Sequence, residues 1–246
     1  LISGTRTTVL NSIYVKNPEA ATGGGGSETI EQVRQNALAY FSTQNRIVTK
    51  EDYVVRTLSM PSKFGSVSKA YVASDEQMLD SELSVDNPLA VNLYCLTYDK
   101  NKRLTNLSIA AKENLKTYLS QYRLLTDAIN IKNGYIVNVG INFKITVLPT
   151  YNSNGVLLAC ISRLRKMFSI DRMNFKSSIY LKDMYIGLAN IAGVQSVFEV
   201  TVANKYDGDY NIENATHNGV IYPSLDPSVF EVKYPNKDIQ GQVITY

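Results

Sequence analysis

The sequence predicts an α+β fold in which ferredoxin-like split βαβ sheets are covered by helices, with a helical subdomain near the N-terminus. Residues 135–148 alternate between apolar and polar side chains, which is typical of a strand with one buried face. Residues 106–122 and 154–168 place apolar side chains at helical spacing instead. Strand and helix patterns follow one another along residues 88–203 in the order expected of a split βαβ unit.

Residues 1–22 are expected to be a strand and a linker from a preceding domain, because β-branched residues are frequent at positions 5–15. A run of four glycines follows. Since glycine has the most backbone freedom to lose, the run favours a bend rather than a helix or strand. We interpret it as a hinge formed by Gly23, Gly24, Gly25 and Gly26.

Residues 23–87 are predicted to be a helical subdomain with one strand. One helix should begin at Ser27, a residue that commonly caps helices. A second should begin at Thr49, which has the spacing of a capping box with Asp52. A strand and then an acidic, solvated loop are expected at residues 66–73 and 74–87.

Residues 88–203 are predicted to form the ferredoxin-like α+β domain. Apolar residues on both faces of 89–98 indicate a central strand, and residues 99–103 indicate a charged turn. Asn133-Gly134 has the composition of a two-residue hairpin turn, since both residues tolerate positive φ. The strand that follows, 135–148, is long enough to extend past its neighbours, so we expect it to expose an edge that can pair with another chain.

The other elements of this domain are a strand, a helix and a further strand, expected at residues 125–131, 178–191 and 194–203. Residues 204–246 should hold a polar loop at 204–228 and short strands at the C-terminal end. A loop of that length indicates a functional or disordered segment.

The composition describes a globular protein, with 44% hydrophobic and 19% charged residues in a chain of 246. The 25 basic and 22 acidic residues leave a net charge of only +3, which is too small a bias to predict nucleic-acid binding. The basic group around Arg163 and Arg165 is interpreted as a solvated helix face. No apolar stretch approaches the ~20 residues of a membrane span. Because the chain begins at Leu1 rather than Met, we expect it to be part of a longer protein.

Catalytic motifs are missing from the sequence. The one histidine, His217, has no nucleophile to pair with, since the sequence contains no Gly-x-Ser-x-Gly elbow and neither cysteine lies near it in sequence. The glycine run lacks the lysine of a phosphate-binding loop. Cys95 and Cys160 lie in apolar runs and are expected to be buried thiols rather than a disulfide or zinc ligands. We therefore predict no enzymatic activity, no cofactor and no small-molecule substrate.

One polar stretch leaves an alternative open. Asp207, Asp209, Asn211 and Glu213 alternate as calcium ligands could, but the glycine and the final carboxylate of an EF-hand loop are absent. We favour an acidic surface loop here, and a non-standard cation site is the alternative.

Several motifs, in their order and spacing, resemble those of the baseplate J-like family. They are the glycine run with Ser27-Glu28, then Asn45–Thr49, Asp52-Tyr53, residues 135–147, Ile191–Val194 and Asp238–Gly241. The likeness covers most of the chain from about Gly23 onward. Within this family the chain is most similar to the baseplate wedge proteins of T-even-like contractile-tailed bacteriophages.

The resemblance implies a structural component of a phage tail baseplate wedge. Such a protein links wedges into a ring around the hub and transmits the rearrangement that triggers sheath contraction. The implied partners are a second copy of the chain, as a homodimer within a wedge, and other baseplate wedge proteins. The implied location is the tail baseplate of the virion, with assembly in the host cytoplasm.

Three residues are candidates for the interfaces of such an assembly. Tyr40 and Gln44 lie on the helix predicted from Ser27, and Tyr135 begins the long strand. Tyrosine is favoured where a surface must be both apolar and hydrated. The alternative function is a carbohydrate- or receptor-binding tail module, which would need aromatic residues gathered on one concave face.

Overall fold

The computed structural model describes residues 46–74, 90–206 and 210–244, together with the single residues Ser12, Ile30, Arg34 and Ala37. Four of the predictions above lie outside these residues, namely the glycine hinge Gly23–Gly26, the interface candidates Tyr40 and Gln44, the acidic segment 75–87, and the Asp207 and Asp209 pair.

The single residues give a partial view of the N-terminal region. Ile30, Arg34 and Ala37 are helical, in the position of the helix predicted from Ser27, and Ile30 is 79% exposed. Ser12 is helical although the pattern of residues 5–15 predicted a strand, since β propensity depends strongly on context.

The α+β fold class is confirmed, and β2 (Ala90–Tyr98) is the central strand of the first sheet, as its two apolar faces predict. β1 (Lys69–Ser74) runs antiparallel along one edge of β2. The other edge carries β4 (Ala128–Asn133) in parallel and β3 (Leu104–Asn106) antiparallel. The helix α4 (Ile109–Ser120) makes the crossover that a parallel pair of strands requires.

The helix α3 (Lys50–Leu58) begins at the predicted capping box. The backbone N–H of Asp52 donates to Thr49 Oγ1 at 3.2 Å, and the N–H of Thr49 donates to Asp52 Oδ2 at 2.9 Å. A short 3-10 helix, η1 (Ser62–Phe64), follows. Side chains of α3, α4 and the first sheet form the first core, which consists of Ile47, Tyr53, Met60, Val67, Val72, Leu93, Cys95, Leu107, Leu115, Leu119 and Ile129.

The strand β5 (Tyr135–Val147) is the centre of a second sheet, and its inward residues Val137 to Ile145 are buried as the alternation predicts. β7 (Val194–Asn204) runs antiparallel along one edge. β11 (Ile239–Val243) pairs in parallel with the other edge, and β10 (Ser228–Glu231) pairs in parallel with the first residues of β5.

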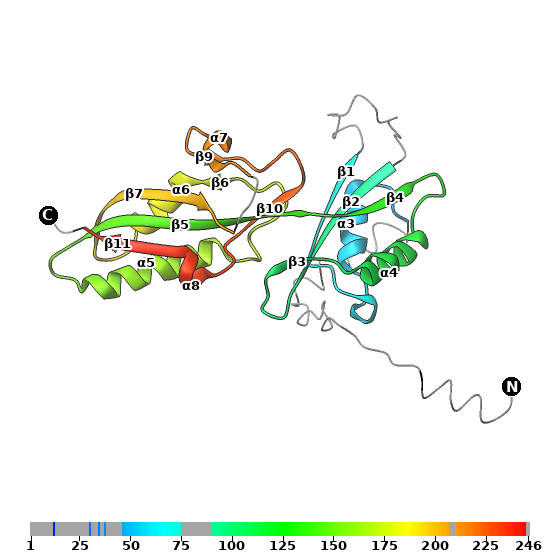
Figure 1. Ribbon diagram of the computed structural model, residues 1–246, viewed down its shortest axis with the longest axis horizontal. Helices are drawn as coiled ribbons and strands as arrows, with labels where there is room; N and C mark the ends of the chain where they lie inside the picture. The colour runs from blue at the N-terminus through cyan, green and yellow to red at the C-terminus, as the bar shows by residue number, and fades with distance from the viewer. Residues whose placement is uncertain are drawn as a thin grey trace.

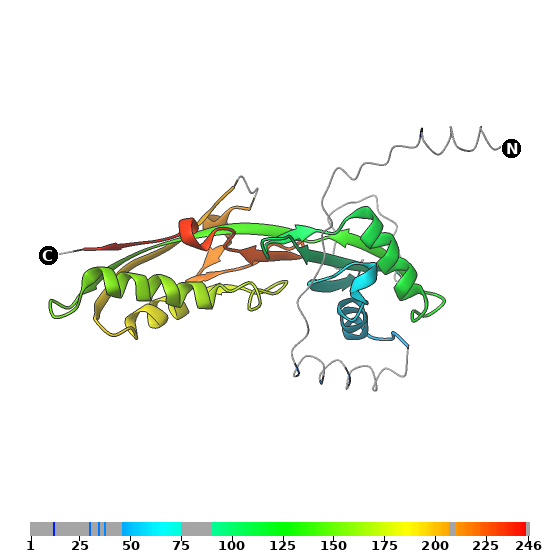
Figure 2. The ribbon, with the colours of Figure 1, turned by 90° about the horizontal axis from the view of Figure 1, so that it is seen from below.

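Two helices, α5 (Ser153–Met167) and α6 (Leu181–Ala189), cover one face of this sheet (Figure 2). Between β10 and β11 the chain makes one short helix, α8 (Pro235–Asp238). The buried centre of the second core contains Val139, Ile141, Phe143, Ile145, Cys160, Leu164, Met184, Leu188 and Phe230.

The two cores lie end to end, and the chain passes directly from β4 into β5 along the length of the molecule (Figure 1). A small cluster bridges them. Its buried members are Leu96, Leu104 and Val229, and Phe175 and Ile136 pack against them. The molecule is therefore elongated, with one shared β ribbon and one apolar bridge between its halves.

Gly134 lies between β4 and β5, and the hairpin predicted at Asn133-Gly134 is wrong. Neither residue has a positive φ, and β4 and β5 belong to different sheets. A Cβ on Gly134 would lie 2.5 Å from Phe175 Cε1 and 3.2 Å from Leu96 Cγ. The glycine is required by this close approach at the bridge, which a local sequence pattern does not reveal.

The exposed edge expected for the long strand is wrong in the middle of β5. Residues 141–145 pair with β7 on one side and with β11 on the other, whereas, among the described strands, residues 135–138 pair with β10 alone. The strand β11, residues 239–243, lies about 100 positions after β5 in the sequence. This pairing therefore could not be predicted from the pattern of β5 itself.

Residues 204–228 contain short elements that pack on the second core. They are α7 (Ile212–Ala215), β8 (Thr216–His217) and β9 (Val220–Ile221), and β9 also pairs with β6 (Ile179–Tyr180). The turn between β8 and β9 is Asn218-Gly219, with φ of +52° and +75°. The two-residue hairpin signal is therefore used here rather than at Asn133-Gly134.

Candidate binding pocket between the two cores

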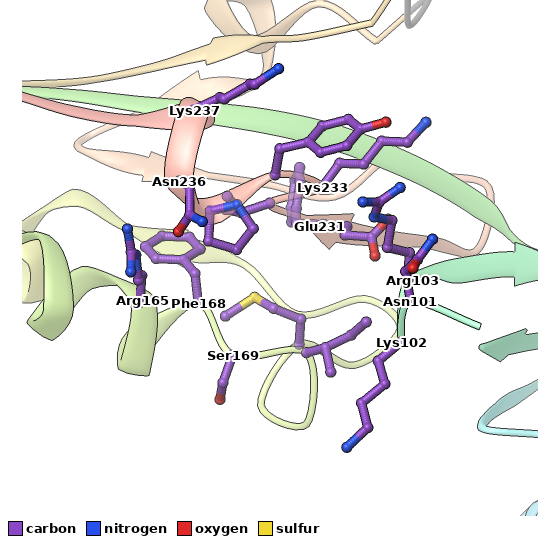
Figure 3. A pocket seen from close by; sticks show the side chains of 16 residues that line it. Asn101, Lys102, Arg103, Arg165, Phe168, Ser169, Glu231, Lys233, Asn236 and Lys237 are labelled. Carbon is purple, nitrogen blue, oxygen red and sulfur yellow. The ribbon is translucent and has the colours of Figure 1, made fainter. Parts of the chain in front are cut away.

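A cavity of about 440 Å³ lies where the two cores meet, and we call it the junction pocket. Its walls come from the turn between β2 and β3, the C-terminal end of α5 with the loop after it, and the segment from β10 to α8 (Figure 3). The lining residues are Asn101, Lys102, Arg103, Arg165, Phe168, Ser169, Ile170, Met173, Phe230, Glu231, Val232, Lys233, Tyr234, Pro235, Asn236 and Lys237.

The turn between β2 and β3 is held by Asp99. Its Oδ1 accepts the backbone N–H of Asn101 at 2.7 Å and of Arg103 at 2.8 Å, and its own N–H donates to the Arg103 carbonyl. Lys102 takes a left-handed backbone conformation with φ of +57°. A side-chain carboxylate that closes a turn in this way fixes the chain locally. The predicted charged turn therefore presents Lys102 and Arg103 in a defined geometry.

Glu231 forms the buried acidic wall of the pocket. It is 5% exposed, and its Oε1 accepts the backbone N–H of Leu104 at 2.8 Å. Burial raises the pKa of this carboxyl above its ordinary value. The hydrogen bond from Leu104 and the charges of Lys233 and Arg103 oppose that rise. The two cations and the N–H of Leu104 therefore offset only part of the cost of burying the charged form of Glu231.

Two tyrosines and Asp238 organise the rim on the side of the second core. Asp238 is buried, and it accepts the Tyr206 hydroxyl and the Tyr234 backbone N–H, each at 2.8 Å. The rings of Tyr206 and Tyr234 meet edge to face, with centroids 5.4 Å apart. The Arg103 guanidinium lies 4.2 Å from the Tyr234 ring centroid, and Lys233 Nζ lies 5.4 Å from that of Tyr206. The contact between Arg103 and Tyr234 links the turn of the first core to the rim of the second.

The end of α5 completes the pocket. Phe168 is buried and forms part of the apolar floor, whereas Arg165 is exposed and lies beside Asn236 in Figure 3. The floor is continued by Ile170, Met173 and Phe230. An apolar floor under a charged rim suits an extended segment that carries both kinds of side chain.

The charge balance of the pocket is strongly positive. Five of its sixteen lining residues are basic and one, the buried Glu231, is acidic. Neither cysteine nor histidine is among the lining residues. The arrangement can attract and hold an anionic group.

The predicted site residues are not brought together here. Tyr135 is 58% exposed at the start of β5 and lines a separate surface depression with Tyr94, Lys132 and Asp226. The candidates Tyr40 and Gln44 and the hinge lie outside the described residues. His217 is exposed in β8, with its ring centroid 6.4 Å from that of Tyr222.

The sequence did contain signals for the junction pocket. Taken locally, residues 99–103 indicate only a charged turn, and Arg165 indicates only a solvated helix face. Their shared basic character was visible, but their convergence with residues 231–237 depends on how the two cores pack.

In the described part of the chain, no three His, Cys, Asp or Glu side chains are grouped so that they could hold a metal ion. No described helix is both long enough and apolar enough to cross a membrane. Cys95 and Cys160 are free and buried in separate cores, as predicted, and burial raises their pKa to about 12 and about 11.

Comparison with solved structures shows a likeness in fold. No protein-family model matches the sequence, and no curated protein matches it. The fold is similar to that of a chain in the cryo-EM structure of the anti-feeding prophage (AFP) baseplate, 6-fold symmetrised. The TM-score is 0.50 at 16% sequence identity, and the match covers 85% of this chain. The chain spans 43% of that baseplate protein, so the likeness concerns fold over less than half of the larger molecule.

Proposed function

We propose that the chain is a structural component of the baseplate of a contractile, phage-like tail. The observation that carries this proposal is the fold shared with a chain of the anti-feeding prophage baseplate over 85% of the present chain. The motifs that resemble the baseplate J-like family support it independently, because they lie in the amino-acid sequence and do not depend on the comparison of folds.

The finer role that we propose is that of a wedge protein. In this role the chain pairs with a second copy within a wedge, contacts other wedge proteins, and helps to close the wedges into a ring around the tail hub. It would be incorporated into the tail baseplate of the virion after synthesis in the host cytoplasm. The rearrangement that triggers sheath contraction would pass through these contacts.

The architecture suits this mechanical role. The two cores share the continuous β4–β5 ribbon, the apolar bridge around Leu96 and Val229, and the hydrogen bond from Leu104 to Glu231. A subunit with several links between its halves can transmit a displacement from one end to the other with little internal deformation. Gly23–Gly26 remain the predicted hinge, with movement between this rigid part and the residues before it. If alanine at all four positions left assembly and infectivity unchanged, the hinge would be disproved.

The test of the proposed function is incorporation into particles. Tails produced with the complete set of tail genes should contain the chain in their baseplates. Omission of its gene alone should give tail components without a closed baseplate, as seen by electron microscopy and by mass spectrometry of purified particles. Omission of a tail-fibre gene serves as the control, because it should leave the baseplate closed. Closed baseplates that form normally without the chain would contradict the proposal.

The competing role, a carbohydrate- or receptor-binding module, receives less support from the aromatic residues. Several tyrosines are used in internal contacts, such as Tyr118 with Tyr122 and Tyr206 with Tyr234. Specific binding of the chain on a glycan array would favour that role.

A further inference from the structure

The junction pocket carries positive charge that the described residues do not neutralise. Lys102, Arg165 and Lys237 are exposed, and none of them forms an ion pair within the part of the chain that the structure describes. The one acidic lining residue, Glu231, is buried and already accepts the N–H of Leu104. The pocket is therefore suited to a ligand that carries several carboxylates.

The sequence of this chain contains a segment with matching chemistry. Residues 75–86 carry five acidic side chains and no basic one, at Asp75, Glu76, Asp80, Glu82 and Asp86. The same segment has apolar side chains at Met78, Leu79, Leu83 and Val85, which suit the floor of Phe168, Ile170, Met173 and Phe230. Charge and apolar content thus both correspond to the pocket.

The segment does not reach across the pocket of its own chain. Ser74 is paired with Val91, so residues 75–89 start and finish at the same end of the first sheet. The turn at Asp99–Arg103 lies at the opposite end of the nine-residue strand β2, about 26 Å away at the usual rise of a strand. Half of residues 75–89, fully extended, spans at most about 26 Å. It would only just reach the near wall, and Arg165 and Lys237 lie beyond it, on the second core.

We propose that residues 75–86 of one copy of the chain dock in the junction pocket of a second copy. The contact is heterologous, because each copy offers its acidic segment at one place and its basic pocket at another. Repetition of such a contact closes into a ring or continues as a filament, depending on the rotation between copies. The inference rests on the proposed function, which it deepens by naming a contact between copies.

Nucleic acid is the less suitable ligand for this pocket. The Tyr234 ring is already covered by Arg103 and met edge-on by Tyr206, so it is not an open platform for stacking bases. The net charge of +3 also gives little general attraction to a polyanion. Competition with an oligonucleotide is nevertheless part of the test.

The first experiment measures binding of a fluorescent synthetic peptide, residues 74–88, to the full chain by anisotropy at low ionic strength. The pocket variant Lys102→Gln/Arg165→Gln/Lys237→Gln should weaken binding about tenfold, because three charge contacts are lost. The matched control Lys63→Gln/Lys116→Gln/Lys182→Gln removes the same charge from exposed positions outside the pocket and should change binding less than about twofold. Equal weakening by the two variants, or no peptide binding at all, would overturn the proposal.

Peptide and competitor controls separate the outcomes further. A peptide with its five acidic residues changed to amides should not bind. A scrambled peptide of the same composition should bind more weakly than the natural order. If the scrambled peptide or a DNA oligonucleotide of equal charge binds as well as the natural peptide, the pocket is a general anion site and the proposed contact is wrong.

The second experiment uses complementary variants of the full chain in light scattering. One variant has Asp75→Asn, Glu76→Gln, Asp80→Asn, Glu82→Gln and Asp86→Asn, and the other is the pocket variant. Neither variant should associate with itself through this contact. In an equimolar mixture, the intact segment of the pocket variant should dock in the intact pocket of the segment variant. The mixture should therefore form a dimer and nothing larger. A mixture that shows only the mass of its separate components would disprove the contact.

These results are independent of the proposed function. A chain that still enters baseplates but lacks the complementation would retain the baseplate role and lose this inference. A chain that shows the complementation but is absent from particles would retain the contact and lose the baseplate role.

Discussion

Glu231 Oε1 accepts the backbone N–H of Leu104 at 2.8 Å in a buried hydrogen bond between residues 127 positions apart. Leu104 begins β3 in the first sheet, and Glu231 ends β10 in the second sheet. Lys69 Nζ donates to Asn174 Oδ1 at 3.2 Å across the same region. Polar contacts thus supplement the apolar bridge, and a buried carboxyl lies between the two cores.

The substitution Glu231→Gln should make stability less dependent on pH. The folded-state pKa of Glu231 is raised above the ordinary value of 4.5, so the folded protein binds more protons than the unfolded chain in the window above 4.5. The contribution of this group therefore falls as pH rises through that window. The variant keeps an acceptor for Leu104, and near pH 7 it should be more stable than the parent by on the order of 1 kcal/mol.

Urea unfolding of both proteins between about pH 4 and about pH 7 measures this difference. The two stability curves should converge towards acid pH, where the parental carboxyl is protonated. Parallel curves would show that Glu231 does not titrate differently in the folded and unfolded states.

The substitution Gly134→Ala should destabilise the protein by about 1–3 kcal/mol, because its Cβ would lie 2.5 Å from Phe175 Cε1. Gly155→Ala is the matched control, since it lies in α5 with no atom closer than 4.0 Å to the new Cβ, and it should be neutral or stabilising. The double variant Gly134→Ala/Phe175→Leu should recover part of the loss. Thermal unfolding measures all three, and equal stability of the two alanine variants would contradict the close-contact explanation.

The substitution Gly219→Ala should cost about 1 kcal/mol for a purely backbone reason. Gly219 has φ of +75°, and no atom lies within 4 Å of an added Cβ. Gly219→Asn should cost less, since asparagine tolerates the left-handed conformation better than alanine. Denaturant unfolding ranks the variants, and an alanine variant as stable as the parent would show that the β8–β9 turn changes its conformation freely.

The two buried cysteines should report the opening of each core separately. Cys95 lies in the first core and Cys160 in the second, and burial raises the pKa of both thiols. Alkylation by iodoacetamide at neutral pH should therefore be much slower in the native protein than in urea, since the thiolate is the reactive form.

Peptide mass mapping of the alkylated protein gives the rate at each cysteine. Similar native-state rates at Cys95 and Cys160 would indicate that the cores open together, as their shared ribbon and bridge suggest. Rapid labelling of either cysteine without denaturant would contradict its burial.

Several features of this protein were determined by the sequence alone. The capping box of Thr49 and Asp52, the helix at 153–167 and the buried face of β5 all follow from residues within a few positions of one another. Interactions of this range depend on side-chain chemistry and on the periods of helix and strand. The resemblance to a baseplate family was likewise carried by short motifs in a fixed order.

The tertiary structure decided which strands share a sheet and where the junction pocket lies. Asn133-Gly134 and Asn218-Gly219 have the same hairpin composition, yet only the second makes the turn, because at Gly134 the chain passes from β4 in one sheet into β5 in the other. The pocket draws basic residues from three segments that are far apart in the sequence. Their meeting depends on the packing of the two cores, which is a sum of many long-range contacts and leaves no local pattern in the chain.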